Sequence, residues 1–168
     1  LLLTGSLPNT EELEGFCERL RAFRHLSGDY IHEFPLTTPS KSIMNTLARA
    51  VLLLYRFDAE PDEISPEHEI DVAMSMIARL PRIAALAHMA RVAQREGRLP
   101  QIPQPSPDLS TAESVLQVLR GGDDFTHDEA MLLDVMMMLH AEHGGGNNST
   151  FACRVLSSSA TDPYSAYA

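Results

Sequence analysis

The sequence contains no tryptophan, only two cysteines and only 6% aromatic residues among its 168 amino acids. Cys17 and Cys153 lie far apart and no CxxC pair is present, so free thiols in a reducing compartment are expected, and we predict a cytoplasmic location. Basic residues are also few, 13 against 23 acidic ones, which gives a net charge of −10. Because nucleic-acid binding needs clustered basic side chains to neutralise phosphates, no nucleic-acid partner is expected.

Long apolar runs are missing as well. The longest, residues 50–55, is far shorter than the roughly 20 residues that span a bilayer. The initial LLLTGSLP lacks the basic leader and long apolar stretch of a signal peptide, so no membrane partner is expected. The 44% hydrophobic content is nevertheless typical of a globular protein with a sizeable core. The length predicts a single domain over residues 1–168.

Helical signals recur along the chain, whereas no segment shows the alternation of a strand, so an all-α fold is predicted. Ser65 followed by Pro66 predicts a helix start, and Pro81 is expected to kink or restart that helix. Residues 98–109, RLPQIPQPSPDL, contain four prolines and are interpreted as an extended connector between helices. Three further helices are predicted to begin at capping boxes, formed by Asn9 with Glu12, Ser110 with Glu113, and Thr126 with Glu129.

Two predicted helices are apolar on almost every face, residues 43–55 (IMNTLARAVLLLY) and residues 131–140 (MLLDVMMMLH). A helix that is apolar all round must be buried on all sides. One such helix can form the centre of a domain of this size, whereas two favour packing against a second subunit. We therefore predict a homodimer, with a thick monomeric core as the alternative. Met131, Met136, Met137 and Met138 are interpreted as adaptable core packing and not as a ligand site.

The most unusual stretch is LHAEHGGGNNSTF, residues 139–151. His140 and His143 are three residues apart and so share neighbouring positions on the last turn of a helix. The glycines that follow allow one helix to end and another to begin sharply. Asn147 and Ser149 are N-cap residue types, behind which come the unpaired N–H groups of the next helix. Imidazoles, amides and backbone donors in one loop predict a site for an anion with carbonyl or carboxylate oxygens.

Other interpretations of this loop are open on these grounds alone. The glycines can form a plain turn while the histidines cap helix carbonyls. A metal site of His140, Glu142 and His143 is disfavoured because Glu142 points off the face that the histidines share, so no metal is predicted. The spacing excludes HExxH zinc-protease chemistry, and Ser149 lacks the elbow and acid partner of a catalytic nucleophile. No strand precedes the glycines, as a dinucleotide fingerprint would require.

LHAEHGGGNNSTF resembles the histidine-rich loop of the citrate synthase family, in particular the bacterial branch that includes 2-methylcitrate synthases. The similarity covers essentially the whole chain, since family segments resemble LLLTGSLPNTEELEGF, IARLPRIAALAHMA, LSTAESVLQVLRG and SSSATDPYSAYA. One departure is at Ser42-Ile43-Met44, where many members carry a His-Pro before the methionine. The resemblance implies a multi-helical fold like that of the family's large domain.

The resemblance also implies a reaction and a site. Members of this family condense an acyl-CoA, usually acetyl-CoA, with oxaloacetate and hydrolyse the thioester to give citrate and CoA. The acyl-CoA is a substrate, and no cofactor is expected. By resemblance, His143 belongs to the oxaloacetate pocket, Asn147 lies beside it and His140 supports it from the preceding turn. Ser149 is expected to help position a catalytic histidine that follows in the family sequence.

Family members run well beyond this length, and after a DPYSAYA-like stretch they carry a Gly-Pro-x-His motif, a second histidine and a base aspartate. The chain begins with Leu1, not Met, and stops at Ala168 before these residues. We therefore expect the N-terminal part of the large domain, inactive alone, with part of the oxaloacetate site and the dimer interface. That interface is expected to use residues 43–55, 131–140 and 149–156. A non-catalytic helical dimerisation module is the alternative.

Overall fold

The computed structural model describes residues 5–34, 40–100, 102–103, 106, 108–141, 144 and 146–168. Within these residues all regular structure is helical and no strand is present, which confirms the predicted class. The helices are α1 (Thr10–Phe23), α2 (Gly28–Glu33), α3 (Ile43–Leu54), α4 (Pro66–Arg95), α5 (Thr111–Arg120), α6 (His127–Leu139), α7 (Asn148–Ser158) and α8 (Pro163–Tyr167), with the 3-10 turn η1 (Tyr55–Phe57) after α3. None of these described helices is long and apolar enough to cross a membrane. Both cysteines are free.

The helix starts follow the predicted local signals. Capping boxes begin α1, α5 and α6, each with the side chain of its third residue returned to the N-cap backbone. Ser65 caps α4, and Pro66 occupies the first helical position, where its missing N–H removes no helical hydrogen bond. These pairs satisfy backbone groups that would otherwise lack partners at the helix ends.

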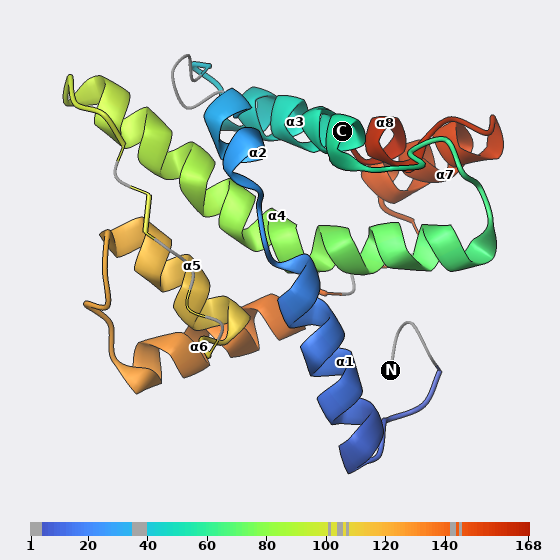
Figure 1. Ribbon diagram of the computed structural model, residues 1–168, viewed down its shortest axis with the longest axis horizontal. Helices are drawn as coiled ribbons and strands as arrows, with labels where there is room; N and C mark the ends of the chain where they lie inside the picture. Colours follow the sequence, from blue (N-terminus) through green and yellow to red (C-terminus); the bar gives the residue numbers. More distant parts are fainter. Residues whose placement is uncertain are drawn as a thin grey trace.

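Helix α4 is the centre of the fold and packs against α1, α3 and α5 (Figure 1). It runs unbroken through Pro81, so of the two predicted outcomes, a kink or a restart, only the restart is wrong. Figure 1 instead shows the helix changing direction about midway, as expected where a proline removes one N–H and crowds the carbonyl four residues before it. Small buried side chains let neighbouring helices approach it closely: Ala78, Ala85, Ala87, Ala90 and Ala93.

The core lies between α2, α3 and α4. Tyr30 is 1% exposed, and its hydroxyl donates to the Ala50 carbonyl of α3 at 2.9 Å. Its ring also meets Phe57 edge to face, with centroids 5.6 Å apart. Ile83 and Leu86 of α4 are fully buried in the same cluster. Helix α2 was not predicted, because six residues are too few for a periodic pattern, and its fixed position comes from the tertiary burial of Tyr30.

Helices α6 and α7 lie at the edges of the molecule and pack mainly against α5 and α8, respectively. Helix α6 buries only Ala130, and α7 buries no residue. The expectation that residues 131–140 are buried on all sides is therefore wrong for the single chain. The interpretation of the methionines as core packing fails with it, since Met131, Met136 and Met138 are exposed. We refer below to the exposed apolar residues of α6 and α7 as the outer set: Met131, Leu132, Val135, Met136, Met138, Leu139, Phe151, Val155 and Leu156.

Candidate functional site

His140 terminates α6 as its C-cap. Its Nδ1 atom lies 2.7 Å from the Met136 carbonyl oxygen, and because a carbonyl can only accept, Nδ1 must carry the proton. This bond selects one tautomer and orients the exposed ring. In the neutral ring Nε2 is then an acceptor, whereas in the imidazolium it becomes a second donor.

Asn147 is the N-cap of α7. Its Oδ1 atom accepts from the backbone N–H groups of Ser149 and Thr150, at 2.9 and 3.1 Å. Two of the backbone N–H groups expected to be unpaired at this helix start are thus already satisfied. These two groups are therefore not free to bind an anion, contrary to the anion-site interpretation of the sequence. The cap uses only Oδ1, so the Nδ2 group of the same amide remains a candidate donor toward a carboxylate.

The structure places His140 and the pair Asn147 and Ser149 at the two ends of one short connection between α6 and α7. Gly144 in that connection has φ +78°, a left-handed conformation that favours glycine. His143, the residue expected to contact oxaloacetate most directly, lies outside the described residues, as does Glu142. In the part of the chain that is described, no three His, Cys, Asp or Glu side chains gather as a metal site would require.

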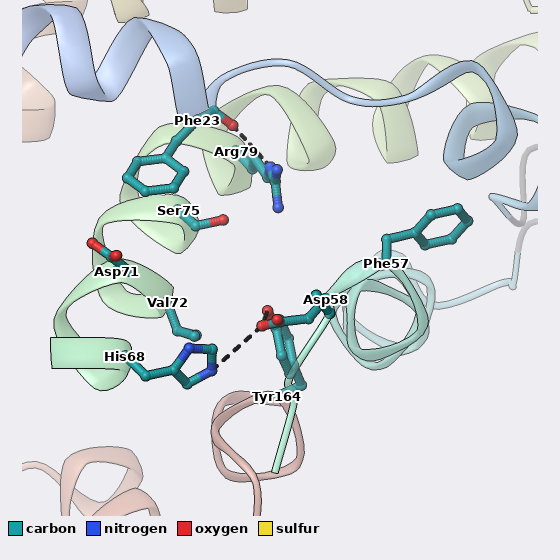
Figure 2. Close-up of a pocket in the computed structure, with 10 residues that line it drawn as sticks. Phe23, Phe57, Asp58, His68, Asp71, Val72, Ser75, Arg79 and Tyr164 are labelled. Atoms are coloured by element: carbon teal, nitrogen blue, oxygen red, sulfur yellow. Dashed lines mark hydrogen bonds and ion pairs between the residues drawn. The ribbon is translucent and has the colours of Figure 1, made fainter. Parts of the chain in front are cut away.

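A second polar site, which sequence reasoning missed, is a pocket of about 260 Å³ between α1, η1, α4 and α8 (Figure 2). We call it the α4–α8 pocket. Two of its polar residues, Asp58 and Tyr164, are 106 positions apart, so no sequence motif could have revealed it. Its walls are formed by Phe23, Phe57, Asp58, Ala59, His68, Asp71, Val72, Ser75, Arg79 and Tyr164.

One side of the α4–α8 pocket is organised by Asp58. The Tyr164 hydroxyl donates to Asp58 Oδ2 at 2.6 Å, and Nε2 of His68 lies 3.5 Å from the same oxygen without making a hydrogen bond. Burial, followed by this hydrogen bond and the nearby carboxylate charge, raises the pKa of Tyr164 well above its usual value. Tyr164 is therefore a neutral donor throughout the physiological pH range and fixes α8 against the residue that follows η1.

The other side carries Arg79 and Ser75 of α4. The Arg79 Nε–H donates to the Phe23 carbonyl at the end of α1, at 2.8 Å. Burial lowers the pKa of Arg79, against the opposing effect of Tyr164, Tyr30 and Asp58. Ser75 is 5% exposed, yet its hydroxyl has no hydrogen-bond partner among the described residues. One side of the pocket thus carries a cation and an unsatisfied hydroxyl, and the opposite side carries a carboxylate and an imidazole.

Residues 1–168 match the family model described as citrate synthase, C-terminal domain. The chain is 32% identical over 164 residues to citrate synthase of Deinococcus radiodurans, covering 98% of this chain and 41% of that protein. It is 34% identical over 173 residues to citrate synthase of Synechocystis, covering 100% and 40%. It is 31% identical over 173 residues to 2-methylcitrate synthase 1 of Corynebacterium glutamicum, covering 99% and 43%.

Solved structures agree with these matches. Citrate synthase from Pyrobaculum aerophilum superposes with a TM-score of 0.81 at 25% identity, covering 99% of this chain and 42% of that one. Citrate synthase from Thermoplasma acidophilum, in a ternary complex with carboxymethyl coenzyme A and oxaloacetate, shares the fold with a TM-score of 0.80 at 24% identity. The chain spans only about 40% of the length of the curated relatives. It matches the family model from its first residue to its last, and it belongs to the citrate synthase family.

Proposed function

We propose that this chain forms one wall of the oxaloacetate pocket in an enzyme that condenses an acyl-CoA with oxaloacetate and releases citrate and CoA. The observation that carries the proposal is the connection from α6 to α7, where His140 and Asn147 lie at opposite ends and His143 falls between them. Family membership over residues 1–168 supports it. Relatives of similar identity include both citrate and 2-methylcitrate synthases, so acetyl and propionyl groups are both candidate acyl groups.

The chemistry of the connection suits a dianionic 2-oxo acid. The Nδ2–H₂ group of Asn147 donates to a substrate carboxylate, and the positive end of α7 favours the same negative charge. An imidazole N–H of His143 directed at the ketone oxygen stabilises the charge that develops there as a carbon nucleophile attacks the ketone carbon. His140, oriented by its bond to the Met136 carbonyl, supports the pocket from the end of α6. Ser149 helps to position a catalytic histidine outside this chain.

In this reaction the acyl-CoA loses a proton from the carbon next to its thioester, and that carbon forms a bond to the ketone carbon of oxaloacetate. The ketone oxygen takes up a proton, and hydrolysis of the thioester then releases CoA. The residues assigned to this chain act on the oxaloacetate oxygens. The groups that move the proton from the acyl-CoA are assigned to the parts of the relatives that this chain does not cover, so the chain alone is expected to be inactive.

The outer set supports a second part of the proposal, a homodimer. Met138 and Phe151 are each 66% exposed, although large apolar side chains seldom cluster on a free surface. A stable interface buries about 800 Å² on each partner, for which α6 and α7 supply the apolar side chains. This agrees with the interface implied by the family resemblance for residues 131–140 and 149–156. Residues 43–55 are the third expected contributor, and there Met44 and Leu52 are exposed.

The test is a thiol-release assay on the complete protein that contains this chain, with oxaloacetate and either acetyl-CoA or propionyl-CoA. His143→Gln and Asn147→Ala are each expected to lower kcat/KM for oxaloacetate by about 100-fold, because each removes a donor to developing or fixed negative charge. His88→Gln, at an exposed position on α4, is the control and should retain full activity.

The 168-residue chain assayed alone should show no turnover. Acyl-CoA-dependent citrate formation by that chain, or full activity in both site variants, would contradict the proposal. A complete protein that dimerises but never releases CoA would instead favour the non-catalytic dimerisation module.

A further inference from the structure

We propose that the α4–α8 pocket binds a small carboxylic acid that also carries a hydrogen-bond donor, such as a 2-hydroxy acid or an amino acid. Of the residues that the structure describes, the pocket shares none with the oxaloacetate wall assigned to residues 140–149. The inference therefore stands apart from the proposed condensation reaction. Among its described residues the pocket combines four features: an unsatisfied hydroxyl, an arginine without an ion pair, an opposing acceptor wall and a limited volume.

The unsatisfied hydroxyl belongs to Ser75. A serine within a helix ordinarily bonds to a carbonyl of the preceding turn or points to solvent. Ser75 does neither, since it is 5% exposed and its Oγ atom has no hydrogen-bond partner in the part of the chain that the structure describes. Figure 2 shows this hydroxyl directed toward the space between Arg79 and Asp58. A buried polar group without a partner is unfavourable, and a ligand oxygen at this point would satisfy it.

Arg79 lies four residues after Ser75, and so on the same face of α4. Among the described residues only its Nε–H is used, to hold the Phe23 carbonyl at 2.8 Å, and Figure 2 shows the far end of the guanidinium extending into the pocket. Within the described part of the chain no carboxylate forms an ion pair with Arg79, and Asp71 is paired with Arg19. A guanidinium presents parallel N–H groups that match the two oxygens of a carboxylate. The acid group of the ligand is therefore assigned to Arg79 and Ser75.

The opposing wall accepts hydrogen bonds. Asp58 receives one from the Tyr164 hydroxyl at 2.6 Å and one from the Glu60 backbone N–H at 3.0 Å, and each carboxylate oxygen has capacity for another. The adjacent His68 Nε2 is buried and has no hydrogen bond to any described residue. A hydroxyl or ammonium group on the ligand would complete this wall. A dicarboxylate is disfavoured because its second charge would face Asp58.

The volume limits the size of the ligand. About 260 Å³ exceeds the roughly 30 Å³ that one water molecule occupies and lies below the range of about 300–1,000 Å³ typical of drug-sized ligands. Phe23, Phe57 and Val72 provide an apolar wall for a short carbon skeleton. A compact acid with one donor group therefore fits the pocket better than either water alone or a nucleotide.

The experiment is a ligand-observed NMR titration of the protein with L-lactate and L-serine as probes. Acetate, which lacks the donor, and ethanolamine, which lacks the acid, are the matched controls. We expect saturable binding of at least one probe, with a Kd of about 1 mM, and at least about tenfold weaker binding of both controls. Absence of saturable binding by both probes, or equal binding of acetate, would overturn the proposal.

Variants assign the binding to the pocket. Ser75→Ala should weaken probe binding by about tenfold and should not lower Tm, because it deletes an unsatisfied hydroxyl. Ser114→Ala is the matched control, since Ser114 is 3% exposed with an unsatisfied hydroxyl but lies on α5, outside the pocket. It should leave binding unchanged. Binding that survives Ser75→Ala but is lost in Asn147→Ala would belong to the oxaloacetate wall and would overturn the proposal.

Discussion

Helices α4 and α6 both carry several methionines and other apolar residues, yet they occupy opposite environments. Helix α4 buries side chains along most of its length, including Ile83 and Leu86 at 0% exposure, whereas α6 buries only Ala130. The difference lies in their neighbours, because α1, α3 and α5 surround α4, while α6 packs mainly against α5. The apolar composition of a helix thus indicates that its surface favours burial, but not whether residues of the same chain bury it.

The composition of the two helices is consistent with this difference. Buried alanines on α4 allow three helices of the same chain to approach closely. Helix α6 presents large flexible side chains on several faces, and Leu139, at 74% exposure, illustrates how little of that surface this chain covers. The proposed homodimer would cover this surface of α6 and α7.

The largest expected effect is the loss of folding stability when a core residue of α4 is truncated. Leu86→Ala removes a fully buried side chain and leaves a cavity, which should lower the free energy of unfolding by about 2–5 kcal/mol. Leu139→Ala makes the same chemical change on α6 and should alter monomer stability by less than about 0.5 kcal/mol. Urea unfolding at low protein concentration measures both. Equal destabilisation by the two variants would remove the basis of the comparison.

The next effect concerns association. Met136→Glu places a charge in the outer set, and burying that charge at an interface should raise the dimer Kd by at least about 30-fold, or about 2 kcal/mol. Leu7→Glu is the control, since Leu7 is 77% exposed and lies outside the outer set. Sedimentation equilibrium provides the measurement. The dimer proposal fails if Met136→Glu associates as tightly as the parent protein.

A smaller difference is expected between the N-caps of α5 and α6 in their contribution to the free energy of unfolding. Ser110→Ala removes the hydroxyl that accepts from the Glu113 N–H at 3.2 Å and should lower the free energy of unfolding by about 1 kcal/mol. Thr126→Ala removes the equivalent cap of α6. Because α6 is peripheral in the monomer, its loss should appear mainly as faster amide exchange within α6 and less in global unfolding. The opposite pattern would mean that α6 is integral to the monomer core.

The smallest effect is a pH dependence at the start of α6. Glu129 accepts from Arg120 at 2.6 Å and from the Thr126 N–H at 2.7 Å, and these bonds lower its pKa from 4.5 to about 2. A depressed carboxyl pKa stabilises the fold above pH 4.5, and this contribution is lost as the pH falls toward 2. Glu129→Gln should therefore flatten the decline of Tm in that range. Glu14→Gln, at an exposed position on α1, should not.

The sequence predicted the features that depend on neighbouring residues. The capping boxes at Asn9, Ser110 and Thr126 were correct because each joins groups three residues apart. Helix α2 and the α4–α8 pocket were missed because Tyr30 is positioned by α3, and Tyr164 by Asp58, through contacts between distant segments. The assignment of His143 to oxaloacetate stays a prediction.

The helix through Pro81 shows a different limit. The local rule predicted a kink or a restart and could not decide between them. The structure shows one continuous helix, in which Arg82 and Ile83, directly after the proline, are buried. On α6 the local pattern likewise indicated an apolar surface, but it could not show which faces this chain buries, and only Ala130 is buried.

The comparison between α4 and α6 is tested most directly by hydrogen–deuterium exchange measured across a range of protein concentrations. We expect the amides of α4 to be equally protected at every concentration, because this chain alone covers them. Protection of α6 and α7 should increase as the protein is concentrated, because a second copy then covers the outer set. Protection in α6 and α7 that is strong and independent of concentration in a protein shown to be monomeric would contradict the account.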